Sequence, residues 1–269
     1  MDITIGILTW NARALLEQLL DSILATVSGV EYEILVVDNG SADGTVEMLR
    51  ERYPQVVRVE NPENRGVAPA RNQLLEKARG RYILSVDVDT TFTQKGAVET
   101  LVATMDRIPE AAVGGPKLVY KDGSLQLSCR PFPSPLNILV EGTLLKKYFP
   151  QSRFVRDYTL EDWDHAELRE VDWMYGAALV IRREALARIG CFDERFFYLY
   201  EDIDLCFQAR RHGYKVIYIP QAVICHHLER EERPLFAKTL RTHLRSIRRY
   251  LLKDYVRLLG LKATGKWPQ

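Results

Sequence analysis

Short apolar runs alternate with amphipathic segments through the first hundred residues of the chain. Four runs rich in β-branched residues predict strands, and three segments between them repeat apolar residues at helical spacing. The predicted strands cover residues 3–8, 33–37, 56–60 and 82–86, and the predicted helices cover residues 14–25, 45–53 and 67–78. This βαβαβ order predicts an α/β protein built on a mostly parallel sheet, which binds ligands where its strands end.

The second half of the chain has a different pattern, which follows one more predicted helix at residues 95–106. Asp122 and Gly123 predict a hairpin turn within residues 120–124, because this pair accepts positive φ angles. Residues 130–164 contain four prolines and several aromatic residues, which predict a long irregular segment that forms binding loops. Regular elements then resume, with strands predicted at residues 171–181, 215–219 and 222–226 and helices at residues 183–189 and 202–212. We expect one mixed α/β domain with a helical tail, since no repeat or flexible linker divides the chain.

Charge is balanced over the whole chain but not along its length. The 37 basic and 36 acidic residues give a net charge of +1, which does not predict nucleic acid as a partner. Residues 233–262 hold nine of the basic residues and one acid, so the remaining 28 basic and 35 acidic residues carry a formal charge of −7. One apolar stripe runs along this basic segment and consists of Leu240, Leu244, Ile247, Leu251 and Leu258. We expect the stripe to pack on the acidic body, and contact with an anionic membrane surface is the alternative.

Cysteine content and hydropathy indicate the compartment. The four cysteines are widely scattered and form no Cys-x-x-Cys pair, which argues against a zinc knuckle or a disulfide framework. Thr4 and Thr9 interrupt the apolar run at residues 3–10, no basic stretch precedes it, and we therefore do not expect a signal peptide. No apolar run approaches the roughly 20 residues of a membrane-spanning helix. We expect a cytoplasmic protein, with peripheral contact at the inner face of the cell membrane as an open alternative.

Two acidic side chains follow the predicted strand at residues 82–86. Asp87 and Asp89 are two residues apart, so they project to the same face if the extended backbone continues. Two carboxylates on one face repel each other unless a cation lies between them, and their hard oxygen ligands suit Mg²⁺ or Mn²⁺. The alternative is a structural role, in which both acids accept local hydrogen bonds from the next turn.

Two more strand ends carry residues suited to a nucleotide. Asp38 ends the second predicted strand and could accept hydrogen bonds from a nucleobase. Residues 64–72 place Gly66 with Arg65 and Arg71 around the start of a predicted helix, where backbone N–H groups and the helix dipole favour an anion. Arginine is also a natural ligand of phosphate, although surface ion pairs are an equal alternative for both side chains.

Acids and histidines in the second half could complete an active site. Glu201 and Asp202 stand where a helix is predicted to begin, so they either compensate the helix dipole or supply a general base. His226 and His227 follow a predicted strand and could supply an imidazole ligand, whereas an ordinary structural role is the alternative.

Taken together and in this order, these segments resemble the GT-A glycosyltransferases of family 2, and in particular their bacterial rhamnosyltransferase-like branch. The resemblance extends over most of residues 1–227. Its landmarks are residues 7–11, 36–41, 64–72 and 87–89 in the first half, and residues 176–178, 190–194, 201–205 and 220–226 in the second.

The resemblance implies a GT-A fold with one domain over residues 1–229 and a basic amphipathic helical tail over residues 230–269. A Rossmann-like nucleotide-sugar half with a mostly parallel mixed sheet would cover residues 1–115, and an acceptor half would cover residues 116–229. The implied activity is inverting, Mg²⁺- or Mn²⁺-dependent transfer of a sugar from a nucleoside-diphosphate sugar. Rhamnose is one candidate for this sugar. A glycan or lipid-linked acceptor would receive it in the synthesis of cell-surface polysaccharide.

The resemblance also implies roles for individual residues. Asp202 would be the general base with Glu201 beside it, Asp89 would bind the metal, and Asp87 would face the ribose or the metal. His226 matches a histidine that completes the metal site in some relatives, although His227 beside it leaves that assignment open. The nucleotide-sugar-binding set would consist of Thr9, Asn11, Asp38, Asn64, Arg65, Gly66, Arg71 and Asp87.

Two other functions compete with this interpretation. A sugar nucleotidyltransferase also needs a nucleotide-binding sheet with acidic metal ligands, but residues 7–11 lack the glycine-rich, lysine-bearing phosphate loop of that class. A non-catalytic subunit that binds a nucleotide sugar in a polysaccharide assembly is the second alternative. Asp89, Asp202 and His226 argue against it, and product formation decides between the two.

Overall fold

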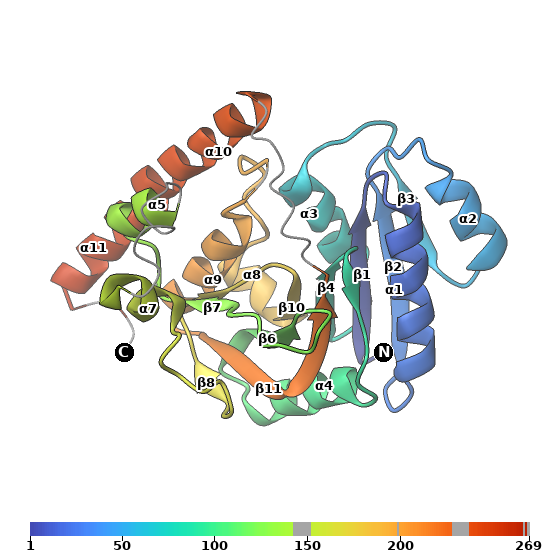
Figure 1. Cartoon of the computed structure of the whole chain (residues 1–269), viewed down its shortest axis with the longest axis horizontal. Helices are drawn as coiled ribbons and strands as arrows, with labels where there is room; N and C mark the ends of the chain where they lie inside the picture. The colour runs from blue at the N-terminus through green and yellow to red at the C-terminus, as the bar shows by residue number, and fades with distance from the viewer. Residues whose placement is uncertain (142–151, 198, 228–236, 266, 268–269) are drawn as a thin grey trace.

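The computed structural model describes residues 1–141, 152–197, 199–227, 237–265 and 267. Nine of the described strands form one twisted sheet that runs through the molecule (Figure 1). Its order is β3 (Val57–Glu60), β2 (Tyr32–Asp38), β1 (Ile3–Thr9), β4 (Tyr82–Asp87), β10 (Ala178–Arg182), β6 (Ala111–Val119), β11 (Lys215–His226) and β5 (Thr90–Thr91), and β8 (Arg169–Glu170) also pairs with β11. The sheet is mixed and the fold is α/β, as the sequence predicts.

The first four strands of this order are parallel, and they end at the same edge. Thr9 lies opposite Asp38 in the pairing of β1 with β2, and Leu8 lies opposite Asp87 in the pairing of β1 with β4. The segments between these strands form α1 (Arg13–Thr26), α2 (Thr45–Arg52) and α3 (Val67–Lys77). Polar residues that are far apart in the sequence therefore meet at the carboxyl ends of neighbouring strands.

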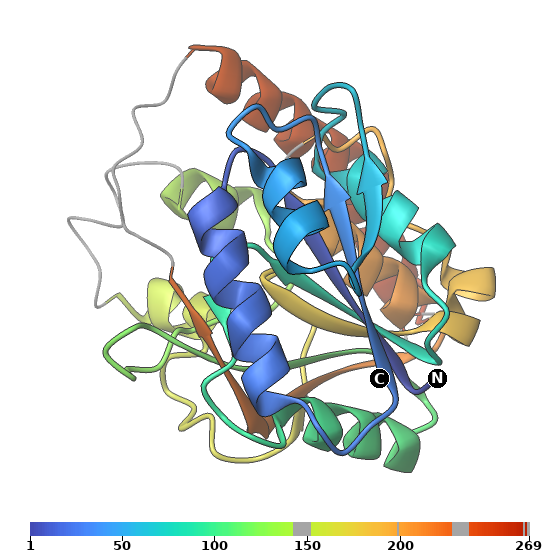
Figure 2. The ribbon, with the colours of Figure 1, turned by 90° about the vertical axis from the view of Figure 1, so that its right-hand side faces the viewer.

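Helices cover both faces of the sheet because its strands are apolar on both sides. α1 and α4 (Ala97–Arg107) pack on one face, where Leu16, Leu20 and Leu101 meet alternate residues of the strands. Figure 2 shows α1 lying in front of the strands. α3 and α9 (Glu201–Arg211) cover the opposite face with buried side chains such as Leu74 and Phe207. Because helices bury both faces of the sheet, the carboxyl ends of its strands are held in fixed positions, and so are the polar residues that they carry.

β6 was not predicted, although it is a central strand of the sheet. Its sequence contains Gly114, Gly115 and Pro116, which are typical of a turn. A side chain at Gly114 would meet Met105 and Val180 at 3.0 Å, so the glycine is required by close packing. Pro116 pairs with Ile219, and a β-bulge interrupts β11 directly after that residue. Tertiary packing explains a composition that local sequence patterns assign to a loop.

The structure corrects four other predicted segments. Residues 171–181 form two strands, β9 (Trp173–Met174) and β10, because the chain turns between them; β9 pairs with β7 (Cys129–Arg130). Residues 215–219 and 222–226 instead form one strand, β11, interrupted by its bulge.

The predicted irregular segment at residues 130–164 contains α5 (Pro135–Glu141) and α7 (Arg153–Thr159), and its residues 142–151 lie outside the described part. The predicted helix at residues 183–189 is present as η1 (Arg183–Ala185) followed by α8 (Leu186–Ile189).

The tail forms α10 (Ala237–Tyr250), the π-helical segment η2 (Leu251–Tyr255) and α11 (Val256–Ala263), which lie along the body beside α5 (Figure 1). Tyr250 donates a hydrogen bond from Oη to the Pro133 carbonyl at 2.9 Å, and the Leu258 side chain is buried. The expected packing of the tail is therefore confirmed for its inner side. Leu244 of the predicted stripe is exposed, however, and residues 230–236 and the Leu240 side chain lie outside the described part.

A buried acid in η2 makes the stability of the protein pH-dependent. Asp254 is fully buried, and burial together with the charge of Asp204 raises its pKa to about 8. The native state then holds a proton that the unfolded chain releases near pH 4, so this group lowers stability as the pH rises from about 4 to about 8. We expect Asp254→Asn to be more stable than the wild type at pH 8, by on the order of 2 kcal/mol, and the gain to shrink towards pH 5. Urea unfolding at both pH values measures this, and identical pH dependence in the two proteins would contradict it.

Candidate active site

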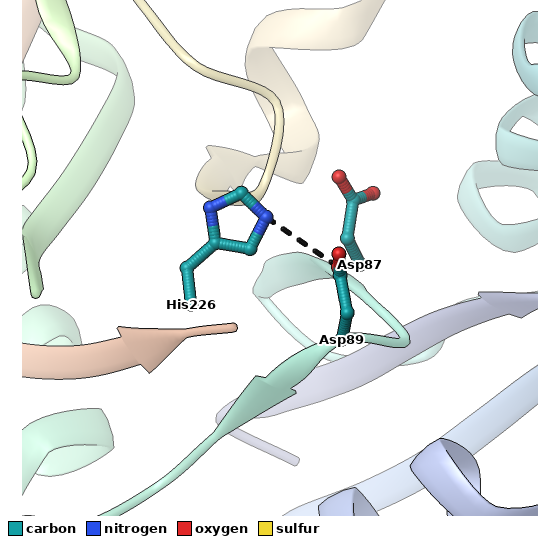
Figure 3. Close-up of side chains that lie close together, drawn as sticks. All are labelled: Asp87, Asp89 and His226. Atoms are coloured by element: carbon teal, nitrogen blue, oxygen red, sulfur yellow. Dashed lines mark ion pairs between the residues drawn. The ribbon is translucent and has the colours of Figure 1, made fainter. Parts of the chain in front are cut away.

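Two acids and one histidine meet at the edge where β4 and β11 end. One ligand atom each of Asp87, Asp89 and His226 lies within 4.8 Å of the others, and Nε2 of His226 is 3.4 Å from Oδ1 of Asp89 (Figure 3). The pairing of β11 with β5 brings these residues together, because it places His226 opposite Thr90. The backbone N–H of His227 donates to the Asp89 carbonyl at 2.7 Å and fixes the turn. Burial raises the pKa of Asp89, but the hydrogen bond and charge of His226 outweigh it, and the net shift is downward.

The structure distinguishes the two adjacent histidines. His226 lies in the cluster and is buried, whereas Nε2 of His227 lies 2.8 Å from the Thr91 hydroxyl. Nδ1 of His226 lies 2.7 Å from Oε1 of Gln126, a buried side chain. Because an amide oxygen only accepts hydrogen bonds, Nδ1 of His226 donates to Gln126, and Nε2 is left to face the carboxylates, where it can bind either a proton or a cation. Local sequence patterns do not indicate Gln126, since it is 100 residues away in the chain.

Arg71 connects this cluster to the acids of α9. Its buried guanidinium donates to Oδ1 of Asp87 at 2.7 Å, to Oε1 of Glu201 at 3.0 Å and to the Gly176 carbonyl at 3.0 Å. Burial lowers the pKa of Arg71, but the charges of Asp87 and Glu201 more than offset it and raise the pKa above its ordinary value. We predicted this arginine as a nucleotide-sugar-binding residue. The structure places its charge among protein groups, underneath the residues that line the site.

Glu201 and Asp202 begin α9 in different surroundings. Asp202 is half-buried, and its two carboxylate oxygens accept hydrogen bonds from Gly176 N–H at 2.9 Å and Ile203 N–H at 2.8 Å. Burial raises the pKa of Asp202, and burial together with the charge of Asp202 raises the pKa of Glu201 to about 7. Tyr200, directly before the pair, has a φ of +74°, an unusual backbone conformation for a residue with a side chain. Strain and raised pKa values are both typical of an active site.

The ends of β1 and β2 carry two buried polar atoms whose hydrogen-bonding capacity is unused among the described residues. Oδ2 of Asp38 accepts hydrogen bonds from Gly40 N–H at 3.2 Å and Ser41 N–H at 3.0 Å. Oδ1 of Asp38 and Oγ1 of Thr9 are also buried, and neither has a hydrogen-bond partner in the described part of the chain. Unsatisfied buried polar atoms are costly, so a ligand that bonds to both is expected here.

Asn11 supports the same region. Its backbone N–H donates to the Ser41 hydroxyl at 2.8 Å, and its side-chain oxygen accepts from Ala42 N–H at 2.8 Å. The residue therefore holds the turn that follows Asp38. This places the predicted nucleotide-binding residue Asn11 at the edge of the site, with its side-chain oxygen bonded to protein.

Asn39 organises the loop that carries Arg65. Its Nδ2 donates to Oδ1 of Asn64 at 3.0 Å, and its Oδ1 accepts from Arg65 N–H at 3.0 Å. Gly66 has a φ of +91°, and a Cβ there would meet the Phe197 ring at 2.6 Å, so only glycine fits. The Arg65 side chain is exposed while its backbone is held, which suits a ligand-binding cation. The role of Asn39 was not predicted, because its partners are 25 to 27 residues away in the chain.

The geometry of this edge agrees with the families that the sequence matches. Residues 4–162 match the model of the family described as Glycosyl transferase family 2. The chain belongs to glycosyltransferase family 2. A second model, described as Glycosyl transferase family group 2, matches residues 145–260, which include Glu201, Asp202 and His226. Together the two matches cover the acids of the first half and the acids of α9.

The family 2 chain is similar to a curated relative along most of its length. It is 32% identical over 234 residues to the N-acetylglucosaminyl-diphospho-decaprenol L-rhamnosyltransferase of Mycobacterium tuberculosis strain H37Rv, and the match covers 81% of this chain and 74% of the relative. The resemblance to the rhamnosyltransferase-like branch is confirmed, and the chain is a glycosyltransferase.

Two solved glycosyltransferases show the same fold. GalNAc-T7, in a crystal structure with UDP, GalNAc and Mn²⁺, superposes with a TM-score of 0.66 and 15% identity, covering 92% of this chain and 48% of the solved chain. The mannosyltransferase PcManGT of Pyrobaculum calidifontis, in complex with GDP-Man and Mn²⁺, has a TM-score of 0.61 and 20% identity, covering 96% and 64%. The chain thus spans about half to two thirds of these proteins. The predicted GT-A fold is confirmed.

Proposed function

We propose that this chain transfers a sugar, with rhamnose the first candidate, from a nucleoside-diphosphate sugar to a hydroxyl group of a glycan or lipid-linked acceptor. The observation that carries the proposal is the continuous link from the cluster of Asp87, Asp89 and His226 to the acids of α9. Arg71 bonds to Asp87 and to Glu201, and Gly176 joins Arg71 to Asp202. One part of this site suits a diphosphate and the other suits an acceptor hydroxyl. Similarity to proteins of O-antigen biosynthesis and of teichuronic acid biosynthesis supports a context of cell-surface polysaccharide synthesis.

The base of the donor would bind at the ends of β1 and β2. The unpartnered Oδ1 of Asp38 would accept a base N–H, and the Thr9 hydroxyl would bond beside it. The exposed Arg65 side chain would approach the diphosphate, and Asn64 and Gly66 would hold the loop that carries it. This arrangement supports the predicted nucleotide-sugar set, with Arg71 as the buried support of Asp87 rather than a direct ligand.

The residues at the β4 edge fit a divalent cation. Asp89 and His226 would hold Mg²⁺ or Mn²⁺, with Asp87 as a third ligand, because their atoms already converge and Nε2 of His226 faces the two carboxylates, where a cation would replace its proton. The bound cation would supply a counter-charge for the departing nucleoside diphosphate. The Mn²⁺ in the two solved relatives supports this assignment.

Asp202 would act as the general base of a single displacement. Its carboxylate would take the proton of the acceptor hydroxyl while that oxygen bonds to the anomeric carbon, and the bond from the anomeric carbon to the diphosphate oxygen would break with inversion. A raised pKa makes Asp202 a better proton acceptor than an ordinary aspartate. The two backbone N–H groups that bind its oxygens fix its orientation and leave lone pairs for the incoming proton.

Binding measurements with the full chain test the donor side of this proposal. Calorimetry with dTDP-rhamnose, UDP-hexoses and GDP-sugars, each with Mn²⁺ and then with EDTA, should show one preferred donor whose affinity falls without metal. Asp38→Ala should weaken binding of every donor that shares the preferred base. No affinity for any donor would overturn the proposal. Binding without product formation in the presence of an acceptor would favour the non-catalytic subunit instead.

The hydrogen bond from His226 to Gln126 predicts a measurable effect on the metal. Gln126→Leu removes the acceptor that fixes the His226 tautomer, so we expect Mn²⁺ affinity to fall about 10- to 100-fold. Electron paramagnetic resonance of Mn²⁺ in the presence of nucleoside diphosphate measures this. Gln126→Glu keeps an acceptor oxygen and should retain much of the affinity.

Gln94 provides the matched control for this experiment. Its amide also bonds to β11, at Gln221 and Val223, but it does not contact His226. Gln94→Leu should leave Mn²⁺ affinity unchanged. Equal losses in Gln94→Leu and Gln126→Leu would show that Gln126 acts only through the fold.

A further inference from the structure

The helical tail has an outer side that its packing on the body does not use. The inner side is fixed: Tyr250 and Leu258 are buried, and the Lys253 ammonium bonds to Asp193 at 2.8 Å and to Asp204 at 2.6 Å. These contacts fix α10, η2 and α11 along the surface of the body, and we call these residues, 237–263, the ridge (Figure 1). No described helix is long and apolar enough to cross a bilayer.

Large apolar side chains project from the other side of the ridge. Leu244, Leu252, Val256 and Leu259 are 54%, 65%, 57% and 49% exposed. α5 lies beside the tail and adds two exposed leucines, Leu136 and Leu139. Scattered exposed apolar side chains are normal, but three leucines and a valine on one short ridge form an unpartnered apolar surface.

The charges on this ridge have one sign. Arg245, Arg248, Arg257 and Lys262 are exposed, and none forms an ion pair within the described residues. Asp254 is the single acid of residues 237–263, and because it is fully buried it adds no exposed negative charge to this part of the tail. Exposed leucines combined with exposed cations are the pattern of helices that lie in the headgroup region of an anionic bilayer.

We propose that the outer side of α10 to α11 is a docking surface for a membrane that contains anionic phospholipid. Two copies of the chain would bring eight cations together if they paired through this surface, whereas phosphate headgroups neutralise them. Docking through the tail would hold the acceptor half against the bilayer, where a lipid-linked acceptor resides. This consequence rests on the proposed function, but the docking surface itself does not.

Vesicle co-sedimentation of the full chain tests the surface without measuring catalysis. Binding is expected to vesicles containing phosphatidylglycerol and to be much weaker with phosphatidylcholine alone. The double variant Arg245→Gln/Arg248→Gln should bind about 30-fold more weakly, because each exposed cation contributes about 1 kcal/mol to the free energy of binding to an anionic surface. Leu252→Ser/Val256→Ser should weaken binding by more than about tenfold through loss of apolar burial.

The control is Leu15→Ser/Leu24→Ser, which removes two exposed leucines from α1 and should leave vesicle binding unchanged. Thermal unfolding confirms that each variant is folded. Equal binding by the wild type and both tail variants, or no binding by the wild type, would overturn the proposal. A dimer in solution that dissociates in Leu252→Ser/Val256→Ser would also overturn it and would assign the surface to a second copy. Donor affinity measured in the same samples shows separately whether the proposed function holds.

Discussion

Asp202→Asn is expected to lower the turnover of sugar transfer about 10²- to 10⁴-fold while donor affinity stays close to that of the wild type. The carboxylate is the group proposed to take the acceptor proton, and an amide cannot do so at neutral pH. Asp202 contacts the backbone of Gly176 and Ile203 rather than the residues of the nucleobase region. The donor site should therefore remain intact, so the lower turnover would reflect a slower chemical step.

The measurement compares steady-state transfer with calorimetric donor binding in the same protein preparation. Glu201→Gln is an informative companion, because Glu201 bonds to Arg71 and is more deeply buried than Asp202. We expect it to lose less turnover than Asp202→Asn. Near-normal turnover of Asp202→Asn would remove this residue from the role of base.

Arg71→Met is expected to destabilise the fold by about 3–5 kcal/mol, because it leaves the buried Glu201 and the partly exposed Asp87 without their counter-charge. Glu201 is buried, and its second oxygen, Oε2, already has no hydrogen-bond partner among the described residues. Removing Arg71 would leave Oε1 unpaired as well and would free Asp87 from its only ion pair within the described part. Urea unfolding measures the loss.

Arg65 offers a matched control, because it lies in the loop that leads into α3, the helix that carries Arg71. Its side chain is exposed, so Arg65→Met should leave the free energy of unfolding nearly unchanged and should weaken donor binding instead. The combination Arg71→Met/Glu201→Gln should regain part of the stability that Arg71→Met loses, since both buried charges are then removed. A stable Arg71→Met variant with weak donor binding would contradict the structural role and restore Arg71 as a phosphate ligand.

Much of the fold could be predicted from the sequence because local patterns determine it. β1, β2 and β4 are short and buried on both faces, and the helices between them have clear apolar periodicity. β6 was missed because the reason for its glycines lies in contacts with distant residues such as Met105 and Val180. Similarly, α5 begins with a local cap in which Ser134 and Asn137 bond to each other, and the surrounding prolines masked that signal.

The candidate site likewise contains residues that local sequence patterns predict and residues that depend on long-range contacts. Asp38, Asp87, Asp89 and Asp202 could be proposed from their positions at strand and helix ends, and the resemblance to the family assigned their roles. Which histidine faces the acids could not be predicted, because the choice depends on the register of β11 against β5. Gln126 and Asn39 act through long-range hydrogen bonds that no local pattern specifies. Arg71 was predicted in the site, but its burial depends on the packing of α3 against α9 and Gly176.

Product formation tests the central claim most directly. The full chain is incubated with dTDP-rhamnose, UDP-hexoses or GDP-sugars, Mn²⁺ and a short-chain polyprenyl-diphospho-N-acetylglucosamine, and the acceptor is examined by mass spectrometry. We expect one donor to add a single sugar to the acceptor, EDTA to suppress the reaction and Asp202→Asn to form far less product than the wild type. Absence of product from every donor, together with absence of affinity for any of them, would contradict the account.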